Sequence, residues 1–282
     1  SVSAFLLNRS SDLEHWVIIS SISAPSAVSS GKVLLHPIGF TLKGYAEVFK
    51  NDQVMRGFLN SLIITFCGVM VNLIVTLPTS YALSRSNFSG KKPITIFYLI
   101  TMFFGGGLIP TYLVIQRLQM LNTIWALILP GCLSVYNMIV ARTFFKSNIS
   151  EELYEAAEID GCTQARFFFQ IALPLSKAII AILVLYYGVG HWNSYFSALV
   201  YISDKAKYPL QLVLRNILIT NQTALSQTAT TAAARAALQE KQQLIDVMKY
   251  SLIIISSIPV LVMYPLVQKH FVKGVMIGSM KG

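Results

Sequence analysis

Long apolar stretches alternate with short polar segments along most of the chain. A helix needs about 20 apolar residues to cross a membrane, because its backbone groups must all be hydrogen-bonded within the lipid. Five stretches reach this length, at residues 58–83, 94–116, 123–145, 178–202 and 250–272. The pattern predicts an all-α protein, a polytopic bundle of transmembrane helices.

A sixth stretch, residues 3–23, is atypical for a span. Polar side chains occupy its centre, including Arg9, Asp12 and Glu14. Charges at the centre of a membrane helix cost several kcal/mol each. Either this helix has lost apolar residues or it is not a normal span. We count it as an irregular first helix in a bundle of about six.

Proline and glycine interrupt several of these stretches. Helix-breaking residues are tolerated in membrane helices when neighbouring helices bond the backbone N–H and C=O groups that they leave unpaired. Simple kinks would explain any one of them. Together they predict irregular helices that can move, at Pro78, Pro110, Pro130, Pro259, Pro265 and the glycine run 105–107.

Basic residues in short loops predict the sidedness, because such loops are enriched in Lys and Arg on the cytoplasmic side. They gather after stretch 58–83, around segment 146–177 and after stretch 250–272. We therefore place segment 146–177 and the tail 273–282 in the cytoplasm. The longer loops 25–56 and 203–249 are expected outside. The basic residues concerned are Arg85, Lys91, Lys92, Arg142, Lys146, Arg166, Lys177, Lys269, Lys273 and Lys281.

Composition supports a membrane protein and excludes other classes. The chain is 54% hydrophobic and 12% charged, against about 25% charged residues in soluble domains. Its net charge of +10 is scattered rather than gathered in a stripe, so we expect no nucleic-acid partner. Cys67, Cys132 and Cys162 are far apart, which predicts neither disulfides nor a metal site. The apolar piece "AFLL" is too short for a cleavable signal peptide.

Segment 151–174, "EELYEAAEIDGCTQARFFFQIALP", is too polar for the lipid. Asn148 and Ser150 are both plausible caps for a short helix at 150–160, and Gly161 suits the left-handed residue that closes one. A second helical piece, 163–171, leads to Pro174. The helix is either a solvated linker lying on the membrane or a docking element for a cytoplasmic partner.

The same segment resembles a known motif, the EAA loop of permeases in binding-protein-dependent ABC importers. The pattern is E-A-A, three residues, G, nine residues, then I-x-L-P. "NSLIIT", "PTSYALSR" and the C-terminal "YPLVQKHFVKGVMIGSMKG" are similar to the same family, most of all to its maltose-type carbohydrate-uptake branch. The matching residues are Glu155, Ala156, Ala157, Gly161, Ile171, Leu173 and Pro174.

The resemblance implies an ABC importer type I permease fold, with 1–282 as a single transmembrane domain in the bacterial cytoplasmic membrane. It implies four kinds of partner: a second homologous permease, an ATPase dimer, an extracytoplasmic solute-binding protein and membrane lipid. The EAA helix would be the coupling helix, with Glu155 as the ionic contact to the ATPase and Gly161 as the turn. The chain has no G-x-x-x-x-G-K-[ST] motif, so we expect no enzyme activity and no cofactor of its own, with ATP and Mg on the partner ATPase.

The polar residues of the fourth stretch are candidates for the solute path. Intramembrane polar side chains usually face a bundle interior or a wet cavity. Aromatic rings can also form interfacial belts, and Asn or Ser can join helices. In maltose-type importers two permeases form the membrane path, and by resemblance the other permease makes most of the contacts with the solute. The candidates are His191, Trp192, Asn193 and Tyr195.

The resemblance also implies roles for two further segments. Loop 203–249, with a helix expected at 229–243, corresponds to an extracytoplasmic loop that meets the binding protein. The tail corresponds to a peptide inserted between the two ATPase subunits, with Gly278, Ser279 and Lys281 as contacts. A frayed terminus is the alternative for the tail.

The function predicted is ATP-driven import of a sugar, an oligosaccharide or a polysaccharide. An ABC permease for another solute is the nearest alternative. A secondary transporter would usually carry membrane-buried carboxylates for ion coupling, and beyond the first helix the spans contain essentially none. A membrane enzyme would need a catalytic cluster that lone His191 does not make. A scaffold would leave the EAA pattern unexplained.

Overall fold

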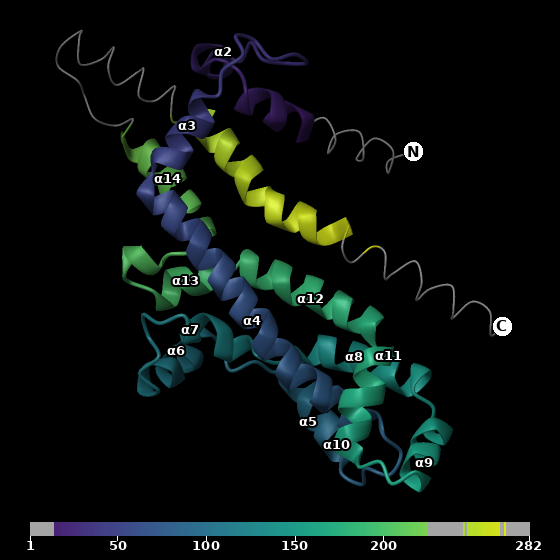
Figure 1. Cartoon of the computed structure of the whole chain (residues 1–282). Helices are drawn as coiled ribbons and strands as arrows, with labels where there is room; N and C mark the ends of the chain where they lie inside the picture. Colours follow the sequence, from purple (N-terminus) through teal and green to yellow (C-terminus); the bar gives the residue numbers. More distant parts are fainter. Residues whose placement is uncertain (1–13, 225–244, 246, 266–267, 269–282) are drawn as a thin grey trace. The chain divides into compact units, whose positions relative to one another are not determined.

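The computed structural model describes residues 14–224, 245, 247–265 and 268, and all regular structure within them is helical. A helix at 14–21 comes first. It is followed by α2 (Pro25–Ser29), α3 (Lys43–Lys50) and the long α4 (Asp52–Ser84), which Figure 1 shows as the longest ribbon.

The elements after α4 are shorter, and several join end to end. They are α5 (Lys91–Phe103), α6 (Leu108–Arg117), α7 (Trp125–Ile128), the 3₁₀ turn η1 (Leu129–Gly131), α8 (Val135–Asn148), α9 (Glu151–Ile159), α10 (Gln164–Phe167), the π-helical turn η2 (Phe168–Ala172), α11 (Leu173–Leu175), α12 (Lys177–Trp192), α13 (Tyr195–Tyr201), η3 (Lys205–Lys207) and α14 (Leu210–Ala224). A last helix covers Val247–Pro265.

The predicted spans correspond to two unbroken helices and three bent pairs. α4 and Val247–Pro265 are each long and apolar enough to cross a membrane. The pairs α5 with α6, α7–η1 with α8, and 164–175 with α12 bend by 113°, 52° and 80°. Counting each pair as one span gives five among the described residues. Two of the expected irregular positions, the glycine run 105–107 and Pro130, lie at breaks, whereas Pro78 and Pro259 lie within unbroken helices.

The fourth predicted span, 178–202, is wrong as a single helix. α12 ends at Trp192, and α13 begins at Tyr195. Between them Oγ of Ser194 donates to His191 O (2.7 Å), and Tyr195 N donates to Asn193 O (2.8 Å). These local bonds replace the helical ladder, which is the usual effect of Asn and Ser near a helix end.

The two long loops expected outside contain helices. Loop 25–56 holds α2 and α3, and loop 203–249 holds η3 and α14. The helix expected at 229–243 and residues 3–13 of the irregular first helix lie outside the described residues. Residues 14–21 of that first helix are helical.

The chain divides into two compact units, and the predicted single domain remains a prediction. The first unit draws on Ser1–Asn60 and Asp204–Leu261. Its small core joins Ile19, Val28 and Val33 to Val247. The ring nitrogen of Trp16 donates to Val33 O (2.9 Å), and the Trp16 ring meets Tyr250 edge to face at 5.1 Å.

The second unit draws on Ser61–Ser203 and Val262–Gly282. Its core is built where the ends of α4, α8 and α12 meet α9 and α10. Buried aromatic and aliphatic side chains fill it: Val69, Leu77, Tyr81, Ala141, Phe145, Ile149, Tyr154, Phe167, Phe168, Ala172, Ile179, Leu183 and Tyr187. Figure 1 shows α9 and α10 beside each other at one end of this unit.

Candidate functional site

α9 begins at a side-chain cap. Oγ of Ser150 accepts a hydrogen bond from Leu153 N (3.3 Å), and Glu151 and Glu152 occupy the first turn. Carboxylates are favourable there because the helix start carries partial positive charge. The other candidate cap, Asn148, instead donates its side-chain amide to Phe144 O (2.9 Å). Ser150 is therefore the cap.

α9 ends at Gly161 in the conformation that the sequence predicts. Its φ is +75°, a left-handed value that glycine adopts without strain. Gly161 N donates to Glu158 O (2.9 Å) and Cys162 N donates to Ala157 O (2.9 Å). This pair of bonds is the Schellman arrangement, which satisfies the last carbonyls of a helix and fixes the direction in which the chain leaves.

The chain becomes helical again directly afterwards. Oγ1 of Thr163 caps α10 by accepting from Arg166 N (3.3 Å). The helix continues through η2 into α11, and the π-helical turn comes just before Pro174, a residue that lacks a helical N–H. At Ser176 the helix axis turns by 80° into α12. Ile171 and Leu173 pack partly buried against the core.

One side of α9 is buried and the other is open. Tyr154 is 4% exposed, whereas Ile159 is 86% exposed. Glu155 and Ala156 are exposed, and Ala157 is partly buried against the core. An exposed isoleucine beside a small residue and a carboxylate offers a close, partly apolar surface to another protein. We call Leu153, Glu155, Ala156 and Ile159 the α9 outer face.

The inner side of α9 is attached to the end of α4 by Arg85. A guanidinium nitrogen of Arg85 lies 3.1 Å from Oε1 of Glu151, and the guanidinium carbon lies 4.4 Å from the centre of the Tyr154 ring. The Arg85 side chain is 8% exposed. Oγ of Ser86 also donates to Glu151 (2.6 Å). The contact of this buried cation with Glu151 is an ion pair without hydrogen-bond geometry, and its position over the Tyr154 ring adds a cation–π attraction.

Aromatic rings continue this attachment towards α10. The Tyr154 ring meets Phe167 edge to face at 5.3 Å, and Tyr81 of α4 lies 5.0 Å from the ring of Phe168. Arg142 of α8 donates through Nε to Leu83 O (2.9 Å). Packed contacts therefore connect α9 with α4, α8 and the start of α12. From the sequence, Arg85 is assigned to the sidedness pattern and to the family-like segment PTSYALSR, but not to a contact with α9.

A polar stripe on α4 supports the broken α7–η1–α8 pair. Asn72, Thr76 and Ser80 recur at four-residue intervals, so they lie on one face of α4. Nδ2 of Asn72 donates to Gly131 O (2.8 Å), and Oγ of Ser80 donates to Met138 O (3.0 Å). Polar side chains of one membrane helix commonly satisfy backbone groups freed in another.

α12 joins the same stripe. Nε2 of His191 donates to Oδ1 of Asn72 (2.7 Å), and the Tyr187 hydroxyl lies 2.7 Å from Oγ1 of Thr76 and accepts from Ser134 N (3.2 Å). A Cβ on Gly68 would lie 2.5 Å from Nε2 of His191. Glycine at 68 therefore makes room for this histidine.

The four solute-path candidates differ in their surroundings. Trp192 is 2% exposed and fills the interior of its unit, while His191 is held by Asn72. Asn193 and Tyr195, at the break between α12 and α13, are exposed. Lining of the solute path stays a prediction, with Asn193 and Tyr195 as its open members. The tail residues Gly278, Ser279 and Lys281 lie outside the described residues.

Comparisons with known proteins show the family of the chain. The model of the family "binding-protein-dependent transport system inner membrane component" matches residues 55–277. The chain is 37% identical over 266 residues to the polygalacturonan/rhamnogalacturonan transport system permease protein YtcP of Bacillus subtilis strain 168, covering 94% of this chain and 91% of YtcP. It is 39% identical over 267 residues to protein LplC of the same organism, covering 95% and 88%.

A solved structure is similar along nearly the whole chain. It is a bacterial ABC transporter involved in the import of the acidic polysaccharide alginate. One of its chains superposes with a TM-score of 0.84 and 28% identity, covering 96% of this chain and 95% of that one.

Proposed function

The chain belongs to the family of inner membrane components of binding-protein-dependent transport systems, and we propose that it imports a carbohydrate with ATP hydrolysed by partner subunits. The observation that carries the proposal is the α9–Gly161–α10 element, which presents an exposed face outward while Arg85 binds its inner side to α4. A permease whose motor is a separate subunit needs such an element.

The α9 outer face is the surface to which the ATPase is proposed to bind. Ile159 and Ala156 supply close apolar contact, and Glu155 supplies a carboxylate for a basic rim of the groove. ATP-driven closure of the ATPase dimer would displace α9. Because Glu151 and Tyr154 hold Arg85, the end of α4 follows, and α11 carries the displacement to α12. The spans then change between inward-facing and outward-facing arrangements.

The chain contains no phosphate-binding loop of its own. The glycine-rich loop of nucleotide-binding proteins needs backbone N–H groups and a lysine around the phosphates. ATP and Mg therefore belong to the partner ATPase subunits in this proposal. A second permease completes the membrane path, and an extracytoplasmic binding protein delivers the solute. The assembly sits in the bacterial cytoplasmic membrane.

The proposed solute is an oligosaccharide or polysaccharide. One relative transports polygalacturonan or rhamnogalacturonan by its name, and the similar solved structure imports alginate. Both names describe carbohydrate polymers. Sugar hydroxyls suit a path of neutral hydrogen-bonding and aromatic side chains, of the kind found at Asn193 and Tyr195.

Copurification and transport together test this proposal. The tagged chain, expressed with the products of its neighbouring genes, is expected to come out of detergent with an ATPase and a second permease. Reconstituted with its binding protein, the complex should hydrolyse ATP faster when oligogalacturonate or alginate oligomer is added and should accumulate the labelled sugar. A complex stimulated only by a non-carbohydrate solute, or a chain that purifies without an ATPase, would contradict it.

A further inference from the structure

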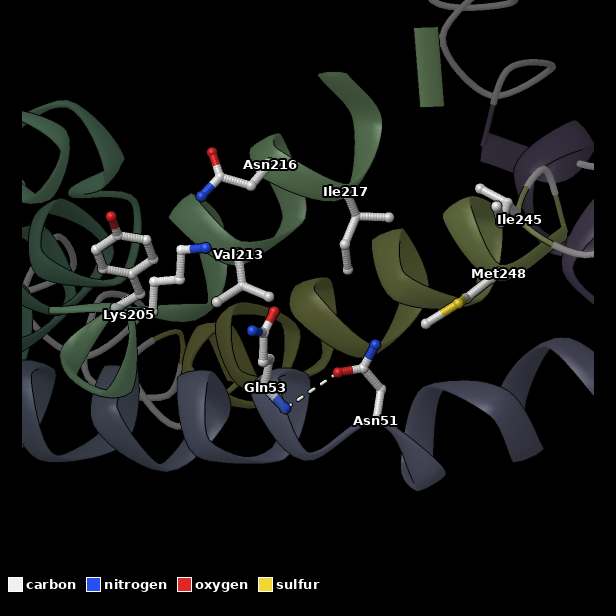
Figure 2. Close-up of a pocket in the computed structure, with 9 residues that line it drawn as sticks. Asn51, Gln53, Lys205, Val213, Asn216, Ile217, Ile245 and Met248 are labelled. Atoms are coloured by element: carbon white, nitrogen blue, oxygen red, sulfur yellow. Dashed lines mark hydrogen bonds between the residues drawn. The ribbon is translucent and has the colours of Figure 1, made fainter. Parts of the chain in front are cut away.

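The first unit contains a cavity that none of the roles above uses. Its volume is about 330 Å³, at the lower end of the range of small-molecule pockets, which is about 300–1,000 Å³. It lies between the start of α4, η3, α14 and the last helix. Figure 2 shows Asn51 and Gln53 on one side and Asn216 on the other, with Lys205 near Asn216.

The polar groups of the cavity are three primary amides, one ammonium and one phenol. The amides are Asn51, Gln53 and Asn216, and the others are Lys205 and Tyr208. Each amide can both donate and accept hydrogen bonds, as a sugar hydroxyl does. Val213, Ile217 and Met248 add an apolar wall, against which the C–H face of a sugar ring can pack. This mixture fits a carbohydrate better than a purely apolar ligand.

Charge narrows the class of ligand. Lys205 is the one charged residue lining the cavity among the described residues, and no acidic side chain lines it there. The neighbouring carboxylate of Asp204 accepts from Ala206 N (2.9 Å) and lies 3.9 Å from Nζ of Lys207. An ammonium without a carboxylate at the cavity wall favours an anionic ligand, and disfavours a metal cation.

Hydrogen bonds hold two parts of the cavity wall, the turn at Lys205–Tyr208 and the side chain of Asn51. Nδ2 of Asn60 in α4 donates to Ala206 O (2.8 Å) and Tyr208 O (3.1 Å), which fixes the turn carrying Lys205 and Tyr208. Oδ1 of Asn51 accepts from Gln53 N (3.0 Å) and Val54 N (3.3 Å). Asn51 thus caps α4 with its oxygen, and its amide nitrogen is left to meet a ligand acceptor.

We propose that this cavity is a binding site for an acidic sugar unit, such as a uronate residue of the imported carbohydrate. It lies on segments whose sequence predicts the outer side of the membrane, so it would meet the sugar before the spans do. The carboxylate pairs with Lys205, and the ring hydroxyls bond Asn51, Gln53 and Asn216. The proposal rests on carbohydrate import, and it assigns to this chain a preference for acidic over neutral sugars.

Equilibrium binding to the whole complex tests the site. Purified complex, without binding protein, is titrated with a short oligogalacturonate and with a neutral galacto-oligosaccharide of equal length, and binding is followed by saturation-transfer NMR. Lys205→Gln should weaken oligogalacturonate binding roughly ten- to hundredfold, the effect of one charge-assisted hydrogen bond. Binding of the neutral sugar should not change. Asn216→Leu should weaken both.

Lys207→Gln is the matched control, because Lys207 lies in the same turn, pairs with Asp204 and does not line the cavity. It should bind both sugars as the wild type does. Equal affinity of Lys205→Gln and the wild type, or no acidic preference in a wild-type complex that does import carbohydrate, would overturn the site and leave the transport function standing. Loss of binding-protein affinity with unchanged sugar binding would also overturn it, in favour of a protein contact.

Discussion

A guanidinium nitrogen of Arg85 lies 3.1 Å from a carboxylate oxygen of Glu151, so the residue after α4 is joined to the first turn of α9. The same guanidinium stacks on Tyr154, the buried residue of α9. α4 is long enough to cross the membrane. A surface element and a membrane span therefore share one buried cation, and this connection is the physical basis of the coupling account.

Replacing Arg85 by Met should uncouple the transporter while leaving it assembled. The variant keeps an apolar stem but loses the ion pair and the ring contact. Because Glu151 is 39% exposed, water screens the ion pair, and we attribute most of the lost stability, about 1–2 kcal/mol, to the ring contact. ATP hydrolysis should continue, and sugar uptake per ATP should fall severalfold in proteoliposomes. The exposed Lys92→Met provides the control, and equal coupling in both variants would refute the connection.

Gly161→Val should have a similar effect for a different reason. The left-handed backbone at φ +75° would strain a β-branched residue by about 1–3 kcal/mol, and α9 would leave at another angle. No atom lies within 4 Å of the added Cβ, so the effect is conformational and not steric. Gly161→Asn should retain most uptake, since Asn tolerates this conformation. Uptake equally impaired by Asn and Val would point to a steric cause and contradict this explanation.

The polar stripe of α4 should stabilise the bundle. Asn72→Leu would leave Gly131 O and the His191 ring without their partner, a loss of about 1–3 kcal/mol. Thermal unfolding of the detergent-purified chain should occur at a lower temperature. Asn193→Leu, at an exposed position, should melt as the wild type does.

Gly68→Ala tests the packing beside the same stripe. The added methyl would meet the His191 ring at 2.5 Å, so the melting temperature should fall. Adding His191→Ala should recover part of the loss, because the clashing ring is removed. Failure of the second change to recover any stability would show that the two residues do not meet in the folded protein.

Cysteine labelling should establish the sidedness. In a background lacking Cys67, Cys132 and Cys162, an impermeant reagent applied to intact cells should label Thr223→Cys but not Ser150→Cys. Lysis should expose Ser150→Cys to the reagent. Labelling of Ser150→Cys in intact cells would reverse the predicted topology and with it the outer location of the sugar cavity.

Local signals in the sequence were sufficient for α9 and its closure. The N-cap, the acidic first turn and the closure at Gly161 depend on neighbouring residues, so the predicted helix 150–160 agrees with α9. The choice of Ser150 over Asn148 as the N-cap needed the structure. The end of the fourth span was not predictable from hydropathy, because Ser194 stands among apolar residues and its side chain bonds locally to His191 O.

Contacts between distant segments could not be predicted from the sequence. Ser86 and Glu151 are 65 residues apart, and Arg85, one residue earlier, pairs with the same carboxylate, so no local sequence signal joins them. The same holds for Asn72 with His191, at a separation of 119 residues. The helices α2, α3 and α14 were missed because each is too short to span a membrane, and a pattern of about 20 apolar residues does not detect shorter helices. The amphipathic pattern of α3, with Gly44 and Val48 on its buried side, is a signal that could have revealed it.

The central claim is that α9 seats on the ATPase, and crosslinking from position 159 tests it most directly. Ile159 is replaced by a photoreactive residue in the assembled complex, and the crosslinked products are separated with and without ATP. The account predicts an adduct with the ATPase subunit at 159, whose yield changes on ATP binding, and none from a probe at Ser194. Efficient crosslinks from 159 only to lipid or to the other permease, in a complex that retains its ATPase, would contradict it.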